Sequence, residues 1–236
     1  MVGSRPPPLS VTDCEGGPLI NRDRRLGGMG GIAFAVALVV GFTFFGPRGG
    51  FYAASAVDSF VDQRATNIII SVYLFAVSTM GLCMLMAYLS ETELSAGRHD
   101  RLAWGTSLLA AASFLIGWGI YFAPSIAVLS GGPTIDPAIS YTFLSAGMII
   151  LFGVGGLLLG SALLTLAIAS REAPMWVRAL NALTGLSALF SFAFILVSRW
   201  SPNQWLPVPF YLVVLWGIVL GVWLLVSPRP ASTSRP

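Results

Sequence analysis

The sequence contains few charged residues. Asp, Glu, Lys and Arg make up only 10% of its 236 residues, whereas soluble domains carry about 25%. So few charges cannot cover a water-soluble globule of this length, and the mean hydropathy of +0.80 indicates lipid as the solvent. The composition therefore excludes an ordinary soluble domain and predicts an all-helical integral membrane protein.

The sequence is also poor in the residues that build metal and redox centres. It has two cysteines, Cys14 and Cys83, one histidine, His99, and no lysine. This excludes a disulfide framework, a Cys/His metal centre and a haem held by two histidines of one chain. The arginines are scattered and form no basic and aromatic patch, so nucleic-acid binding is not expected. We predict no cofactor, no metal ligand and no catalytic residue.

What the sequence has in abundance is long apolar runs. Each is near or above the roughly 20 residues that cross a bilayer, and backbone groups in lipid must be satisfied within a helix. We expect a six-helix transmembrane domain over 27–227, with spans at about 27–46, 68–89, 103–123, 141–169, 177–198 and 209–227. Residues 1–26 and 228–236 are predicted to be disordered cytoplasmic tails.

The arginines predict the orientation. Ten of them flank the side of the runs that carries both chain ends, and only Arg48, Arg64 and Arg199 flank the other side. The excess of positive charge stays in the cytoplasm, so both termini are expected there, with the protein in the bacterial plasma membrane. We expect the first run to be retained as an anchor, with cleavage near Ala53–Ala56 as the alternative.

One polar stretch, SETELSAGRHDR from Ser90 to Arg101, carries five charges and the only histidine. We interpret it as a solvated cytoplasmic loop, with Asp100 as the N-cap of the third span. A catalytic role for His99 would need a partner nucleophile and a pocket, and the sequence indicates neither.

Between the first and second runs, Val57, Phe60 and Val61 recur at helical spacing. They predict a short amphipathic helix on the outer membrane surface. Asp58 and Asp62, four residues apart, could share a cation with Asp136 of the next outer loop, but solvated carboxylates are the expected reading.

Small residues recur at a four-residue spacing in three of the runs. Such pairs let helix backbones approach closely, either within a bundle or between two copies of a chain. We expect packing within the bundle, with dimerisation through these faces as the alternative. The pairs are Gly27 and Gly31, Gly156 and Gly160, and Gly217 and Gly221.

No ionisable residue lies in the middle of a run, which argues against a proton-coupled pump. The polar residues there are mild, and Asn181, Thr184 and Ser191 recur near helical spacing in the fifth run. Interhelical hydrogen bonds are their expected role, and a polar groove for a small ligand is the alternative. Trp118 and Trp216 sit deep in their runs and are expected to serve packing.

Three functions remain. The leading hypothesis is a non-enzymatic bundle whose partners are the lipid bilayer and a lipophilic ligand, partner helices or a second copy of the chain. A small permease comes second, with the glycine-bearing fourth run as its only candidate broken helix. An intramembrane enzyme acting on lipid or quinone comes third.

The stretch REAPMWVRALNALTGLSALF, residues 171–190, carries a resemblance. Here Gly156 and Gly160 lead through Pro174 and Trp176 into a run with an internal glycine, Gly185. In this the chain resembles a family of uncharacterised membrane proteins common in actinobacteria. The resemblance implies six spans and no assigned activity. Independently, Pro174 is expected in a turn or at the first position of a helix, and Trp176 at the headgroups.

Overall fold

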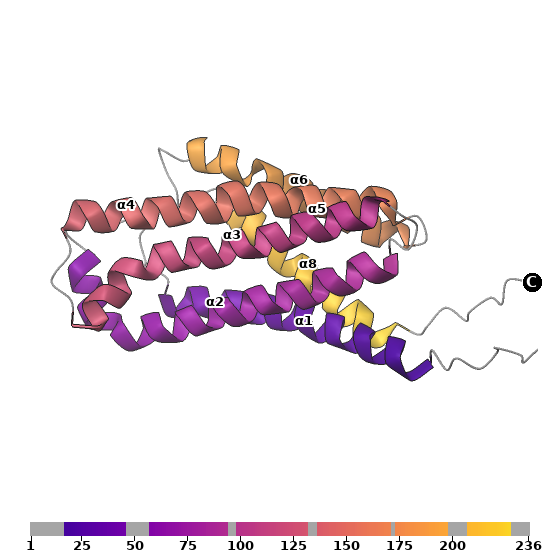
Figure 1. The fold of residues 1–236 in the computed structure, drawn as a ribbon, viewed down its shortest axis with the longest axis horizontal. Coiled ribbons are helices and arrows are strands. Elements are labelled where there is room, and N and C mark those ends of the chain that lie inside the picture. The colour runs from indigo at the N-terminus through magenta and orange to yellow at the C-terminus, as the bar shows by residue number, and fades with distance from the viewer. Residues whose placement is uncertain are drawn as a thin grey trace, which may run out of the picture.

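A computed structural model describes residues 17–45, 57–93, 98–131, 136–170, 173–197 and 207–227. These residues form helices and short turns and no strand. The helices are α1 (Gly17–Phe45), α2 (Val57–Glu93), α3 (Arg98–Leu129), α4 (Pro137–Met148), the π-helical segment η2 (Ile149–Gly155), α5 (Gly156–Ala169), α6 (Met175–Val197) and α8 (Pro207–Val226). Because α4, η2 and α5 run on from one another, the chain forms six rods lying along one long axis (Figure 1).

Five of the rods are long and apolar enough to cross a membrane, which fits a multi-pass membrane protein. Their apolar parts are Arg22–Phe44, Thr66–Ser90, Arg101–Ala127, Ala138–Ala169 and Val208–Val226. The remaining rod, α6, has 23 residues, which is about 35 Å of helix. Each apolar run of the sequence is thus confirmed as helical within the described residues.

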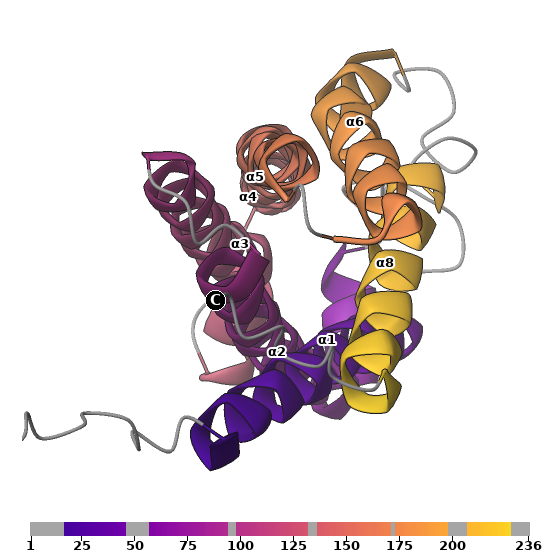
Figure 2. The ribbon, with the colours of Figure 1, turned by 90° about the vertical axis from the view of Figure 1, so that its right-hand side faces the viewer.

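The rods form a closed ring. α1 packs on α2 and on α8, α2 packs on α3, α3 packs on α4, η2 and α5, α5 packs on α6, and α6 packs on α8. Figure 2 looks along the bundle and shows this arrangement, with the first and last helices side by side. Consecutive helices alternate in direction, so the helix ends gather at two opposite ends of the bundle.

One end of the bundle is rich in arginine, and we call it the arginine end. It lies on the right in Figure 1 and holds the starts of α1, α3 and α6. Its described guanidinium groups belong to Arg22, Arg24, Arg25, Arg101 and Arg178. The opposite end, which we call the far end, holds the starts of α2, α4 and α8.

The first two helices are longer than predicted. α1 begins at Gly17, ten residues before the predicted start at 27, so the stretch Gly17–Leu26 is helical and not part of a disordered tail. α2 starts at Val57 and continues to Glu93. The prediction of a separate amphipathic helix before the second span is therefore wrong, because the period of its apolar residues runs on without a break into the span.

Both ends of the third rod and the start of the fourth rod also differ from the prediction. α3 starts at Arg98, so Asp100 lies inside its first turn, and its prediction as the N-cap is wrong. α3 also continues through Pro124, past the predicted end at 123. Before α4, Asp136 is the N-cap: its carboxylate accepts a hydrogen bond from Ala138 N at 2.7 Å, and Pro137 takes the first helical position.

The turn between α5 and α6 agrees with the prediction for Pro174. Pro174 lies just before α6, and its carbonyl accepts hydrogen bonds from Val177 N at 2.9 Å and Arg178 N at 3.2 Å. Arg178 in turn donates from Nε to Ala167 O at 3.1 Å, close to the C-terminal end of α5, where a positive charge is favourable. The expected turn role of Pro174 is confirmed.

The glycine pairs pack within the chain, as predicted. A methyl group built on Gly31 would lie 2.8 Å from Gly217 O, and one on Gly221 would lie 2.8 Å from Gly28 O. These distances are too short for real Cβ atoms, so only glycine allows α1 and α8 to approach this closely. On the other side of the ring, a methyl group on Gly160 would lie 2.7 Å from Gly185 O, which brings α5 against α6 in the same way.

Candidate functional site

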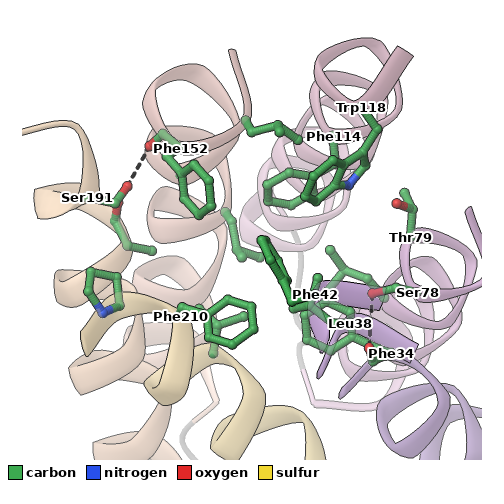
Figure 3. Close-up of a pocket in the computed structure, with 17 residues that line it drawn as sticks. Phe34, Leu38, Phe42, Ser78, Thr79, Phe114, Trp118, Phe152, Ser191 and Phe210 are labelled. Carbon is green, nitrogen blue, oxygen red and sulfur yellow. Dashed lines mark hydrogen bonds between the residues drawn. The ribbon is translucent and has the colours of Figure 1, made fainter. Parts of the chain in front are cut away.

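A pocket lies inside the ring, and every rod contributes to its wall (Figure 3). The space between the side chains amounts to ≈ 630 Å³, including the part that opens to the surroundings. We call it the central pocket. It is lined by Phe34, Leu38, Phe42, Ser78, Thr79, Leu82, Phe114, Trp118, Leu151, Phe152, Gly156, Leu159, Ala188, Ser191, Pro209, Phe210 and Val213.

The central pocket is closed towards the arginine end and extends towards the far end. One turn below it, a tightly packed core fills the ring, with Leu85, Leu163, Trp216 and Leu220 each at most 1% exposed. In the other direction the wall reaches Phe42, in the last turn of α1, and residues of the first turn of α8. The pocket wall thus runs from the middle of the bundle to within one turn of the end of α1 and the start of α8.

Aromatic rings make up much of the wall. Phe42 is their meeting point: its ring lies 5.7 Å from Trp118 and 4.8 Å from Phe210, in both cases edge to face. Trp118 is fixed from behind by Phe75, with parallel rings 3.8 Å apart. Trp118 therefore packs, as expected, but it also presents its ring to the pocket, which sequence reasoning did not predict.

The hydroxyl groups of the wall already have partners. Ser78 Oγ donates to Phe34 O at 2.9 Å, Thr79 Oγ1 donates to Phe75 O at 2.9 Å, and Ser191 Oγ lies within hydrogen-bond distance of Ala188 O and Phe152 O. Since each hydroxyl proton is used, the wall offers no free hydroxyl donor. None of the described lining residues is ionisable, so an ion placed against them would lose its hydration without compensation.

The contact between Ser191 and Phe152 lies at the π-helical segment. η2 sits between α4 and α5, and a π-turn holds one more residue than an α-turn, so it rotates the residues that follow it around the rod axis. α4 packs against α3, whereas η2 and α5 pack against both α3 and α6, so the contact with α6 begins at η2. Gly156 makes room for the Ser191 side chain, because a methyl group on Gly156 would overlap with Ser191 Oγ.

Of the three mild polar residues of α6, two make the interhelical bonds that were expected. Asn181 and Ser191 both bond across to a neighbouring rod. Thr184 is fully buried and its hydroxyl has no partner within the described residues. Ser191 lines the central pocket and Thr184 does not, so the pocket shares one residue with the polar groove considered for α6.

The charged residues whose side chains the structure describes do not line the central pocket. Glu91 lies in the last turn of α2 and His99 in the first turn of α3, at the arginine end. Their side chains, and those of Asp58 and Asp62, lie outside the described part of the structure, as do residues 94–97. Among the described residues no three His, Cys, Asp or Glu side chains gather in a way that would hold a metal ion.

Sequence reasoning missed the pocket because its wall is assembled from six rods. Phe42, Phe152 and Phe210 each look like ordinary residues of an apolar run, and only the ring order brings them together. One signal was present in the sequence: Gly153, Gly155 and Gly156 cluster in the fourth run. We interpreted them as packing or a broken helix, whereas the rod is continuous and carries a π-segment at this place.

Comparison of the chain with protein-family models, with curated proteins and with solved structures finds no significant match. The function is therefore argued from the geometry.

Proposed function

We propose that this protein is a non-enzymatic membrane bundle that binds an uncharged lipophilic ligand in the central pocket. One observation carries the proposal: the described wall combines the aromatic side chains of Phe34, Phe42, Phe114, Trp118, Phe152 and Phe210, and none of its described residues is ionisable. Ligand sites are concave and mostly apolar, with few polar groups to orient the ligand. The described wall of the central pocket is almost entirely apolar, which suits a ligand that is itself apolar.

The same wall supports binding over catalysis. A reaction on lipid or quinone needs a nucleophile, an acid or base, or a donor that stabilises developing charge. The serine and threonine hydroxyls of the wall lie against backbone carbonyls of Phe34, Phe75 and Phe152. A chemical step in the central pocket would have to break these bonds, and no base lines the pocket to activate a hydroxyl.

A permease that moves the lipophile remains the second candidate, because π-segments often occur at functional sites and η2 lies in the pocket wall. Passage to the arginine end would have to cross the packed layer below the pocket. Trp216 and Leu85 of that layer are fully buried. Release of bound ligand into acceptor vesicles on both sides of a reconstituted membrane would support the permease.

Native mass spectrometry of the protein released from nanodiscs tests the binding function. We expect an added mass that survives in Val222→Trp, whose side chain lies on the outer face of α8, and falls in Val213→Trp, which fills the pocket from the same helix. Overfilling costs about 1–3 kcal/mol, which corresponds to a loss of affinity of roughly five- to 150-fold. Equal added mass in both variants, or none in the wild type, would contradict the proposal.

For topology, we propose six spans, α6 included, with both termini in the cytoplasm of a bacterial plasma membrane. The arginine end supports this, since five described guanidinium groups lie there while Asp136 caps a helix at the far end. Single cysteines at Arg22 and Ser130, introduced into a Cys14→Ser/Cys83→Ala background, should react from opposite sides with a membrane-impermeant maleimide. Reaction of both from the outside would reverse or break the proposed topology.

A further inference from the structure

An apolar pocket that opens towards a bilayer does not stay empty. Its walls lose dispersion contacts wherever no atom faces them, so any accessible apolar chain is drawn in. The chains present at the highest concentration around a membrane bundle are the acyl chains of its own lipids, and mass action favours the most abundant ligand. The identity of the occupant therefore depends on which part of a lipid the central pocket can reach and accept.

The depth of the central pocket matches the hydrocarbon of one leaflet. Its wall along α1 runs from Phe34 to Phe42, and eight residues of helix rise about 12 Å. The bilayer hydrocarbon is about 30 Å thick, so one leaflet contributes about 15 Å. α1 ends at Phe45 and α8 begins at Pro207, so the wall of the pocket reaches, at Phe42 and Pro209, to within one turn of these two helix ends.

The wall also decides which part of the lipid stays outside. The deep part of the pocket, around Phe34, Leu82 and Leu159, has no ionisable side chain and is sealed below by the buried core. A phosphate or ammonium group placed there would be desolvated without a partner, which costs far more than the contacts of a chain gain. A hydrocarbon chain has no such cost.

We propose that the occupant is one acyl chain of a bilayer glycerolipid, inserted lengthwise from the leaflet at the far end, with its headgroup left outside the bundle. This rests on the proposed function and names the ligand class of the same pocket. The pocket is then selective for the chain and indifferent to the headgroup. The bound chain belongs to a lipid held inside the ring, distinct from the lipids that surround the bundle.

Photo-crosslinking in nanodiscs tests this. Two phosphatidylcholines are compared, one with a diazirine at the middle of an acyl chain and one with a diazirine on the choline group, and the labelled residues are identified by mass spectrometry. We expect the chain probe to label pocket residues such as Leu38, Leu82 and Phe152, and the headgroup probe to leave them unlabelled. Excess unlabelled phosphatidylglycerol and phosphatidylcholine should compete within about twofold of each other, since the charge of the headgroup stays outside.

The controls separate this proposal from the binding function itself. Val213→Trp should lower labelling of pocket residues by the chain probe about tenfold, and Val222→Trp should leave it unchanged. Labelling of the pocket by the headgroup probe, or displacement of the chain probe by a polyprenol at a tenth of the phospholipid concentration, would overturn the acyl-chain assignment while leaving lipophile binding in place. If neither probe labels the pocket above the level of Val213→Trp, the binding function fails as well.

Discussion

The indole of Trp216 donates from Nε1 to Asn181 Oδ1 at 2.7 Å, across the seam between α8 and α6. Both side chains are buried, Trp216 completely and Asn181 to within 2%. Near the arginine end the rings of Trp176 and Trp223 meet edge to face at 5.6 Å across the same two helices. The seam is therefore fastened below the central pocket.

Replacement of Asn181 by Leu should destabilise the bundle, because the buried N–H of Trp216 loses its acceptor. We expect a loss of about 1–3 kcal/mol in the free energy of unfolding, measured by titration with a denaturing detergent. In a cycle with Trp216→Phe, the coupling between the two sites should be about 0.6 kcal/mol and at most about 1.7 kcal/mol, as for other hydrogen bonds within membranes. A coupling of zero would mean that the bond contributes nothing to the seam.

Gly31→Ala should force α1 away from α8. The added methyl group would lie 2.8 Å from Gly217 O, and a backbone carbonyl cannot give way as a flexible side chain can. A cost of about 1–3 kcal/mol is expected, seen as a lower thermal midpoint in detergent. Gly119→Ala is the matched control: nothing lies within 4 Å of its new methyl group, so alanine should stabilise the helix by up to about 1 kcal/mol.

The fit between Gly156 and Ser191 predicts a rescue. Gly156→Ala alone should destabilise the bundle by about 1–3 kcal/mol, because the methyl group overlaps with Ser191 Oγ. Adding Ser191→Ala removes that oxygen and should recover part of the loss, although Ala188 O still lies 3.0 Å from the methyl group. Additive effects of the two substitutions in thermal unfolding would show that the two residues do not share one contact.

Thr184→Val should stabilise the protein. The Thr184 hydroxyl is fully buried and has no partner among the described residues, so replacing it by a methyl group of similar size removes a desolvation cost of about 1 kcal/mol. Thr165→Val is the comparison, since Thr165 Oγ1 donates to Ser161 O at 2.8 Å within its own helix. We expect Thr165→Val to change the free energy of unfolding by less than about 0.5 kcal/mol. If Thr184→Val is destabilised instead, the Thr184 hydroxyl has a hydrogen-bond partner.

The composition and the spacing of apolar residues predicted the helices, but they did not predict the pocket. The apolar runs located all six rods, since lipid allows few other structures. The errors fall where helices continue beyond the lipid-length run, as at Gly17 and Val57, because hydropathy measures the fit to lipid and not the end of a helix. At Asp136 the signal was available: an acidic residue followed by proline marks a helix start.

The central pocket could not be predicted because no single residue of its wall is unusual. Phe42 and Phe210 are far apart in the sequence and meet only because the first helix lies beside the last. The π-segment is equally hidden, and its contact with α6, between Phe152 O and Ser191 Oγ, joins residues that are far apart in the sequence. Such features follow from the order of the ring, which hydropathy does not encode.

The glycine seam between α1 and α8 has a consequence for biosynthesis. The face of α1 that carries Gly28 and Gly31 meets its partner only after the rest of the ring has been made, because α8 is synthesised after the other five rods. Contacts between such distant parts of a chain form late. Until α8 arrives, the space that becomes the central pocket is an open furrow between helices, so a lipid chain lying in it during assembly is enclosed when the ring closes.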